Sequence, residues 1–418
     1  MPTIYRTQPN HTVHTVIIGE GVHTIGNGAF LRWSRLTKVV ISDSLVFIGN
    51  SAFKLCLRLK EITFGNGIIR IGSQAFSNCV DLENIILPDS LVEIGMKGFY
   101  SCKKATTITF GDRLVYIGSG GFAKCETVKN IIIPNSVNEL EFDAFKHCLS
   151  LESVVIGDNV HIINVETFSN CISLEEIDLN FVEVIELRAF EYCLSLRIVI
   201  IGEALTFINS NPFQFCASLE NIYVNPLNTA YANHQNDGVL YDRAISTIIC
   251  FPTSKKLKNY TYVFPEFIES VQEYAFYACN TFKFLEINRF MKVIGSRSFQ
   301  ECQKLLEVMF PNSLRFIDEY AFLRCTKLTS IFLGKDIILI RSHAFAQCIA
   351  LRCIYFFGDK ELKGLASDAF SKCCFLTVIT RKTYEGNTFA GIRVFKGEAY
   401  GSCPPIKLYD NDYPIENA

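Results

Sequence analysis

Apolar positions recur along the chain at one fixed spacing. Fourteen phenylalanines are 23 residues apart in most intervals, namely Phe30, Phe53, Phe76, Phe99, Phe122, Phe145, Phe168, Phe190, Phe213, Phe276, Phe299, Phe322, Phe345 and Phe370. A fixed period of about 20 to 50 residues is typical of tandem repeats that stack on one another. A unit this short cannot bury its own apolar face, so neighbouring repeats must pack together. The sequence therefore predicts an elongated repeat array.

Each repeat has the same internal order, which residues 75–95 illustrate. They read Ala-Phe-x-x-Cys-x-x-Leu-x-x-Ile-x-Leu-Pro-x-x-Leu-x-x-Ile-Gly. The apolar alternation from Leu82 to Leu87 predicts a short β-strand whose Leu82, Ile85 and Leu87 point inward. We expect these strands to stack as a parallel β-ribbon. We expect the Ala-Phe-x-x-Cys segment to form a short helical or 3-10 turn on the return side, with its phenylalanine stacked on that of the preceding repeat.

The array is interrupted between Phe213 and Phe276, which are 63 residues apart. Residues 237–242 and 246–252 read as two short strands around a polar turn, which predicts a β-hairpin. We interpret the segment as an irregular repeat that carries this hairpin, and the alternative is a hinge between two half-solenoids. The predicted domain organisation is an N-terminal cap with a first strand (1–22), a repeat array (23–224), the irregular repeat (225–264), a second array (265–380), and a C-terminal cap and tail (381–418), of which 408–418 is frayed.

The cysteines follow the same register. Trp33 takes the equivalent position in the first repeat, which suits an apolar packing position better than a metal ligand or a disulfide partner. We therefore predict buried free thiols, with disulfides and metal binding as less favoured alternatives. The cysteine ladder, defined as the thirteen cysteines three residues after a repeat phenylalanine, is Cys56, Cys79, Cys102, Cys125, Cys148, Cys171, Cys193, Cys216, Cys279, Cys302, Cys325, Cys348 and Cys373. The remaining four are the candidates for reactive thiols: Cys250, Cys353, Cys374 and Cys403.

Charge and hydropathy restrict the classes of partner and the cellular location that we expect. The formal net charge is −2, and no block of like charge points to nucleic acid as a partner. No apolar stretch approaches the roughly 20 residues of a membrane helix, so no membrane span is expected. Residues 1–22 lack the apolar core of a secretory signal. We therefore expect a cytoplasmic protein, or one that reaches the cell surface by a non-classical route.

The repeat motif resembles a known family. The string Ile-Gly-x-x-Ala-Phe-x-x-Cys-x-x-Leu-x-x-Ile-x-Leu-Pro, at residues 71–88 and again in part at 145–156, resembles the BspA-like (treponemal-type) leucine-rich repeats, and residues 237–252 are similar to a segment that interrupts such arrays. The resemblance extends from about residue 13 to about residue 380. It implies an α/β leucine-rich repeat solenoid with the parallel β-ribbon on its concave face. It also implies a surface-associated protein, since some members are linked to adhesion to host matrix proteins or to other cells.

Outward positions of the predicted strands supply the candidate binding residues. Because strand side chains alternate, Met309, Phe332 and Tyr355 point out of the ribbon on adjacent repeats. Phe284 shares that face, and Tyr223 holds the equivalent position earlier in the chain. We predict that these five residues form an exposed strip that binds a protein or peptide. The outward residues of the first half are mostly β-branched, which strand propensity explains equally well.

Catalytic signatures do not accompany the repeats. The seven histidines do not recur in register or form H-E-x-x-H, and no phosphate loop or G-x-S-x-G motif occurs. We therefore expect no enzyme, with no catalytic, metal or cofactor-binding residues. Two hypotheses remain: an adhesion or host-interaction protein presented outside the cell, which binds a host matrix or cell-surface protein, and a cytosolic leucine-rich repeat scaffold. The sequence leaves open the ligand and whether the concave or the convex face binds it.

Overall fold

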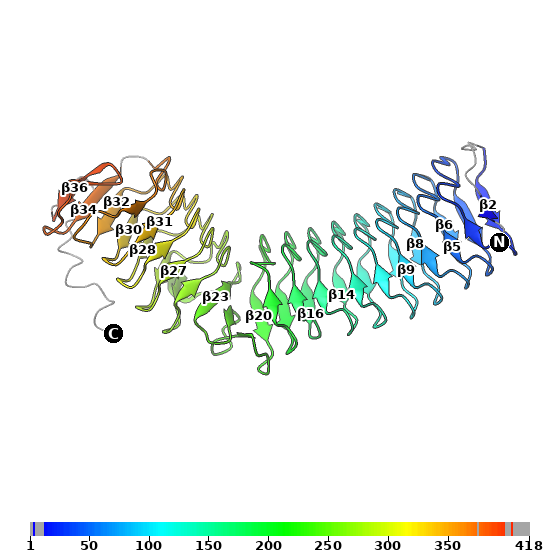
Figure 1. Ribbon diagram of the computed structural model, residues 1–418, viewed down its shortest axis with the longest axis horizontal. Helices are drawn as coiled ribbons and strands as arrows, with labels where there is room; N and C mark the ends of the chain where they lie inside the picture. The colour runs from blue at the N-terminus through cyan, green and yellow to red at the C-terminus, as the bar shows by residue number, and fades with distance from the viewer. Residues whose placement is uncertain (1–2, 5–11, 374–375, 398–402, 404–418) are drawn as a thin grey trace. The chain divides into compact units, whose positions relative to one another are not determined.

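The chain folds into two compact stacks of repeats. The structure, a computed structural model, describes residues 3–4, 12–373, 376–397 and 403. The first unit comprises residues 1–218 with 224–229, and the second comprises 219–223 with the residues from 230 onward. Within each unit the chain winds through successive turns of similar shape, each about one repeat long (Figure 1). The predicted tail at 408–418 lies outside the described residues.

The first ribbon is formed by the strands that the alternation predicts. From residue 15 to residue 380 its paired strands run parallel, with each paired residue beside the one 22 to 24 positions away, as in Ile85 beside Ile108. In the first unit the strands are β2 (Thr15–Ile18), β4 (Lys38–Ile41), β6 (Glu61–Thr63), β8 (Asn84–Ile86), β10 (Thr107–Thr109), β12 (Asn130–Ile132), β14 (Ser153–Val155), β16 (Glu176–Leu179) and β18 (Ile198–Ile201). β20 (Asn221–Val224) falls where the units divide.

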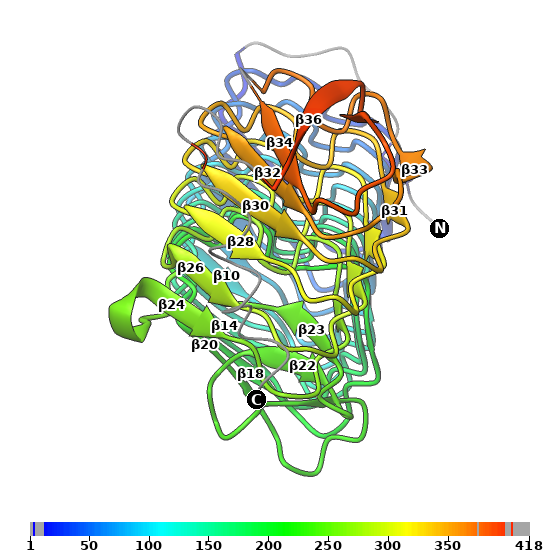
Figure 2. The same ribbon diagram turned by 90° about the vertical axis from the view of Figure 1, so that its left-hand side faces the viewer.

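In the second unit the first ribbon is a single eight-stranded sheet. Its strands follow one another along one side of the stack, and the second ribbon lies on another side (Figure 2). In spatial order they are β24 (Thr261–Val263), β26 (Phe284–Glu286), β28 (Glu307–Met309), β30 (Ser330–Leu333), β32 (Cys353–Phe356), β34 (Thr377–Thr380), β36 (Ile392–Lys396) and β35 (Thr388–Phe389). The last pair, β36 and β35, is antiparallel.

A second parallel ribbon is present that the sequence did not predict. Each repeat contributes one short strand to it, which ends at the isoleucine position of the Ile-Gly pair. In the first unit its strands are β1 (Thr3–Ile4), β3 (Thr24–Ile25), β5 (Phe47–Ile48), β7 (Arg70–Ile71), β9 (Glu93–Ile94), β11 (Tyr116–Ile117), β13 (Glu139–Leu140), β15 (Ile162–Ile163), β17 (Val184–Ile185) and β19 (Phe207–Ile208). In the second unit they are β25 (Ser270–Val271), β27 (Val293–Ile294), β29 (Phe316–Ile317), β31 (Leu339–Ile340) and β33 (Gly364–Leu365). Two paired residues per repeat are too few for a visible period-2 pattern.

The prediction of helical turns on the return side is wrong. Among the described residues the only helical segment is the 3-10 helix η1 (Lys258–Tyr260), which lies in the insert. In the Ala-Phe-x-x-Cys segment the residues two before and two after the phenylalanine mostly have left-handed backbone angles, such as Gln74 (φ 58°) and Asn78 (φ 61°). Left-handed residues cannot continue a right-handed helix. The amides of Gln74, Phe76 and Asn78 instead donate to carbonyls of the next repeat, so the segment stacks as a series of tight turns.

Stacked phenylalanines form the centre of each core, as predicted. In the first unit neighbouring rings from Phe30 to Phe213 lie 4.9 to 5.7 Å apart and within 20° of parallel. In the second unit the stack begins at Phe251, which lies 4.8 Å from Phe276. Phe251 thus supplies the repeat phenylalanine of the irregular repeat, at a position that the regular spacing did not mark.

The insert forms a small antiparallel sheet at the start of the second unit. Its strands are β21 (Tyr231–Ala232), β22 (Leu240–Asp242) and β23 (Thr247–Cys250), which pair in that order. The Asp242 carboxylate accepts hydrogen bonds from the amides of Ser246 and Thr247 and so closes the turn between β22 and β23. β23 then pairs in parallel with β25, which connects the insert to the second ribbon.

Candidate binding surface

The outward side chains of the first ribbon are open to solvent in the first unit. In β8, Ile85 is buried whereas Ile86 is 61% exposed, because successive strand residues face opposite sides. Ile17, Ile132 and Val155 hold the same position and are 72%, 67% and 57% exposed. We call the residues at this position the apolar file, after the five of its seven members that are apolar; the other two are the threonines of β6 and β10. Its members, one per strand from β2 to β14, are Ile17, Val40, Thr63, Ile86, Thr109, Ile132 and Val155.

Charged side chains beside the apolar file are neutralised within the ribbon. The Lys38 ammonium lies 2.8 Å from the Glu61 carboxylate, one repeat away. Lys129 and Glu152 form the same kind of pair at 2.8 Å. Since these charges satisfy one another, the apolar file carries little net electrostatic bias toward a partner. Exposed ion pairs of this kind contribute at most about 1 kcal/mol each to stability.

The first ribbon of the first unit is interrupted, and two of its interruptions are hollowed. Its strands form separate short sheets, β2–β4–β6, β8–β10, β12–β14 and one that contains β16 and β18. Between β10 and β12 lies a hollow of about 660 Å³ whose lining includes Thr109, Asn130 and Ile132. A second hollow of about 280 Å³ lies between β14 and β16, where Val155 and Phe181 contribute to its lining. Members of the apolar file thus border concave places into which a partner side chain could fit.

The structure separates the five residues of the predicted strip. Tyr223 and Phe284 are both 44% exposed, as expected, and Met309 is half-buried. Phe332 and Tyr355 are fully buried, so the prediction that they are exposed is wrong. Their rings stack on each other 4.5 Å apart and 3° from parallel.

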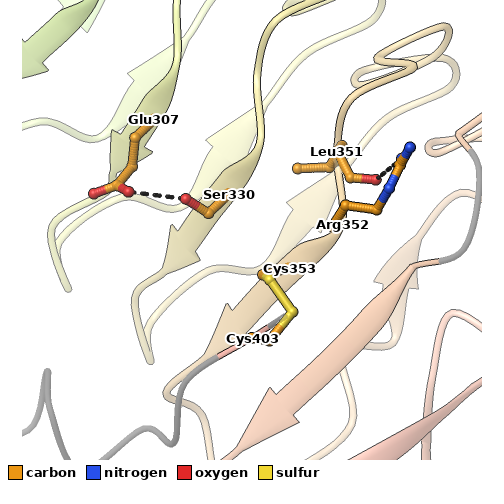
Figure 3. The surroundings of a disulfide bond; sticks show 6 residues. All are labelled: Glu307, Ser330, Leu351, Arg352, Cys353 and Cys403. Atoms are coloured by element: carbon orange, nitrogen blue, oxygen red, sulfur yellow. Dashed lines mark hydrogen bonds between the residues drawn. A yellow bond between two sulfur atoms is a disulfide. The ribbon is translucent and has the colours of Figure 1, made fainter. Parts of the chain in front are cut away.

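A disulfide explains the burial of that part of the ribbon. Cys353 of β32 is bonded to Cys403 (Figure 3). Cys403 thereby joins a small buried cluster on the outward side of the ribbon, formed by Phe332, Cys353, Tyr355, Phe357, Ile379 and Cys403. The interpretation of Cys353 and Cys403 as reactive thiols is therefore wrong, whereas Cys374 lies outside the described residues. One feature of the sequence could have indicated this disulfide: Cys353 lies two residues before Tyr355 and therefore on the same outward face of the strand.

The cysteine ladder is unbridged and, apart from the half-buried Cys373, fully buried, as predicted. Each thiol donates to the carbonyl of a phenylalanine in the preceding repeat, as in Cys79 Sγ to Phe53 O at 3.2 Å. Burial raises the pKa of Cys56 and of Cys148 to about 12, which keeps both thiols protonated at neutral pH. Such thiols are poor nucleophiles and poor metal ligands. Cys250 is also buried, so burial likewise argues against its interpretation as a reactive thiol.

One polar cluster resembles a catalytic triad in composition but not in geometry. Ser342 Oγ lies 2.7 Å from His343 Nδ1 and donates to Asp368 Oδ2 at 2.8 Å. A catalytic triad needs the serine at one ring nitrogen and the carboxylate at the other. Here both lie at Nδ1, since Asp368 Oδ2 is 3.2 Å from that same atom. The cluster therefore does not activate the serine. Sequence reasoning missed it because Asp368 belongs to the next repeat.

The described part of the chain holds neither a candidate metal centre nor a membrane-spanning helix. No group of three or more His, Cys, Asp or Glu side chains is arranged to hold a metal ion within residues 3–4, 12–373, 376–397 and 403. Over the same residues no helix has the length and apolar character that crossing a membrane requires.

Comparison with known proteins identifies the repeat. A family model described as the BspA type leucine rich repeat region, six copies long, matches residues 23–152, 92–220, 139–263 and 248–377. A leucine-rich repeat protein from Bacteroides ovatus is similar in structure, with 22% identity, a TM-score of 0.58 and coverage of 82% of this chain and 87% of that one. A leucine-rich cell surface protein from Faecalibacterium prausnitzii has 23% identity, a TM-score of 0.52 and coverage of 85% and 90%. No curated protein matches the chain. The 23-residue motif, the two stacked ribbons and the family match together show that the chain belongs to the BspA-type leucine-rich repeat family.

Proposed function

We propose that the protein is a non-enzymatic interaction module that binds a protein or peptide through the apolar file of its first unit. The observation that carries this proposal is the exposure of Ile17, Ile86, Ile132 and Val155 on one face, from strands β2, β8, β12 and β14. An isolated exposed apolar residue is ordinary, but a contiguous apolar patch on a soluble protein usually marks an interaction site. Leucine-rich repeat proteins are typically protein-interaction modules, which agrees with this use of the face. That the face is the concave one stays a prediction.

Strand propensity alone does not account for the file. β-branched residues favour strands because they pack on a half-buried pleated surface, yet Ile17, Ile86 and Ile132 are 72%, 61% and 67% exposed. The hollows beside Ile132 and Val155 add concave places of the kind that interface anchors fill. In the second unit the exposed members of the predicted strip, Tyr223 and Phe284, are candidates for additional contacts. Phe332 and Tyr355 are not proposed as contacts, because they are buried.

The disulfide favours a partner outside the cell. Structural disulfides form and persist in oxidising environments and are rare in the cytosol. The Cys353–Cys403 bond therefore supports an extracellular or surface location more than the cytosolic scaffold. The similar structure from Faecalibacterium prausnitzii is described as a cell surface protein. We propose a matrix or cell-surface protein as the ligand, with adhesion as the biological outcome.

The test compares two faces of the same unit. The binding variant carries Ile86→Ser and Ile132→Ser. The control carries Ile69→Ser and Ile162→Ser, which remove isoleucines that are 48% and 45% exposed, just before β7 and within β15 of the second ribbon. Both variants are compared with the wild type for binding to a panel of purified matrix proteins and to intact cells. We expect the first variant alone to lose binding. Equal binding by all three chains would overturn the proposal, and a wild type that binds none of the matrix proteins or cells would favour the cytosolic scaffold instead.

A further inference from the structure

A second surface, in the second unit, has the chemistry of an anion site. A hollow of about 320 Å³ opens beside the first ribbon where β26 and β28 begin. Three of the residues that line it are lysines and none is acidic: Tyr260, Thr281, Phe282, Lys283, Lys304, Leu306 and Lys327. In a chain whose net charge is −2, three cations around one hollow without a carboxylate are a local departure from charge balance.

These lysines also depart from the pairing that other basic residues of the solenoid show. Lys292 lies 2.7 Å from Glu269 one repeat away, as Lys38 lies beside Glu61 in the first unit. Within the part of the chain that the structure describes, Lys283, Lys304 and Lys327 form no ion pair. Two carboxylates of the same repeats are engaged elsewhere, namely Glu301 with Arg324 at 3.2 Å and Glu307 with Ser330 at 2.9 Å.

The positive charges are spaced along the stack. Lys304 and Lys327 hold the same position in successive repeats, so their backbones are about one strand spacing, ~4.8 Å, apart. The Lys283 ammonium lies 4.8 Å from the centre of the Tyr260 ring, which is itself 58% exposed. Lys256 and Lys258, both exposed, precede that tyrosine and add further charge beside it. Cations repeated along one axis suit a linear ligand with regularly spaced anionic groups better than a single small anion.

We propose that this hollow binds a linear acidic glycan, with lysines contacting its sulfate or carboxylate groups and Tyr260 contacting a sugar ring. Lysine acts as a strongly hydrated point charge, unlike the planar fork of arginine, and clusters of basic residues are a recognised signature of heparin-type ligands. A peptide strand is less suited, because β26 and β28 are each paired on both sides and offer no free backbone edge. The proposal does not depend on protein binding at the apolar file.

The second unit supplies a matched control. Another hollow, of about 470 Å³, is also lined by three lysines, Lys335, Lys360 and Lys363, but Asp359 and Glu361 line it with them. The site variant is Lys283→Gln, Lys304→Gln and Lys327→Gln, and the control variant is Lys335→Gln, Lys360→Gln and Lys363→Gln. Both remove the same total charge from the same unit. Thermal unfolding of each variant checks that the fold is retained.

The experiment measures binding of heparin, chondroitin sulfate and hyaluronan to the full chain by titration calorimetry at two salt concentrations. We expect the site variant to bind the preferred glycan at least roughly tenfold more weakly with a shallower salt dependence, and the control variant to match the wild type, since each removed contact reduces counterion release. Sulfate recognition predicts no binding to hyaluronan, whereas carboxylate recognition predicts binding to it. Tyr260→Ala should weaken binding without changing the salt dependence.

Three results would overturn the proposal. The first is that none of the three glycans binds the wild type. The second is that both triple variants lose affinity equally, because the effect would then come from overall charge. The third is that polyglutamate or a single-stranded DNA oligonucleotide binds as tightly as the best glycan and is equally sensitive to the site variant, since the hollow would then recognise another class of polyanion.

Discussion

The two units share one repeat motif but present different outward faces on their first ribbons. In the first unit, Ile86 and Ile132 project into solvent from short sheets with hollows between some of them. In the second unit the ribbon is continuous, and the equivalent positions on β30 and β32, Phe332 and Tyr355, are buried, although Val263 on β24 is 59% exposed. Inward positions are alike in both, because each must fill the same space between neighbouring repeats. The repeat motif therefore specifies the core. Residues outside the motif, such as Cys403, specify which part of the surface is available to a partner.

The difference between the units follows from where apolar side chains find contacts. Large outward residues such as Phe332 and Tyr355 stack on each other and pack against Cys403, which the disulfide holds against β32. Ile132 and Val155 in the first unit have no comparable cover and stay 67% and 57% exposed. An aromatic residue at an outward strand position is therefore not by itself a sign of a binding site in this fold.

The sharpest test of the contrast replaces one equivalent residue in each unit. Phe332→Ala should lower the free energy of unfolding by about 3–5 kcal/mol, because it empties a buried aromatic position. Ile132→Ala removes an exposed side chain and should change it by only about 0.5 kcal/mol. Denaturant unfolding, with hydrogen exchange to assign the affected unit, measures both. Similar small effects for the two variants would show that Phe332 is not covered.

The second test removes the disulfide that holds Cys403 against the buried side of β32. Replacing Cys353 and Cys403 together by serine should destabilise the second unit by about 2–4 kcal/mol, since the bond closes a loop with a sequence separation of 50 residues. Hydrogen exchange in β30 and β32 should accelerate, while β8 and β12 of the first unit stay unchanged. Wild-type protein treated with a dithiol reductant should behave in the same way, because the ladder cysteines have no bond to lose. Unchanged exchange in β30 would indicate that the disulfide does not maintain the burial of Phe332.

A pH titration tests the interior that the two units share. Burial raises the pKa of the Cys148 thiol from 9.0 to about 12, so the unfolded chain releases this proton at lower pH than the folded chain does. The contribution of this proton to the free energy of unfolding is therefore complete below pH 9 and is lost as the pH rises toward 12. The free energy of unfolding falls by about 1.4 kcal/mol per thiol and pH unit in that range. Denaturation at pH 8 and pH 10 measures the loss. Cys148→Ala should reduce the slope of the free energy of unfolding against pH by the equivalent of one proton. An unreduced slope would mean that this thiol is not buried.

The smallest effect concerns the left-handed turns that both units contain. Gly120 has a φ of 62°, and a Cβ there would first meet the flexible Lys97 side chain at 3.3 Å, so Gly120→Ala tests mainly backbone strain. Lys372 has a φ of 61° and an exposed side chain. We expect Gly120→Ala to cost about 1 kcal/mol and Lys372→Gly to gain up to about that amount. Thermal unfolding measures both, and a destabilising Lys372→Gly would show that its side chain makes a contact worth more than the strain.

The sequence predicted correctly those features whose residues recur in many repeats. The strands of the first ribbon, the stacked phenylalanines and the buried thiols follow from positions that recur many times, so each repeat supports the interpretation of the others. It failed on the return side, where the same spacing is compatible with a helical turn or with stacked turns. Hydrogen bonds between repeats, such as Phe76 N to Gly98 O, decide in favour of stacked turns. No single repeat carries that information.

The sequence by itself determined the repeat, the family and the residues of the core, because burial between stacked units imposes the same inward pattern every 23 residues. Only the tertiary structure decided the second ribbon, the pairing of Cys353 with Cys403 and the burial of Phe332 and Tyr355. It also placed Lys283, Lys304 and Lys327 around one hollow without a carboxylate. These features depend on contacts between residues that are distant in the chain or unique within it, and a periodic pattern carries no record of such contacts.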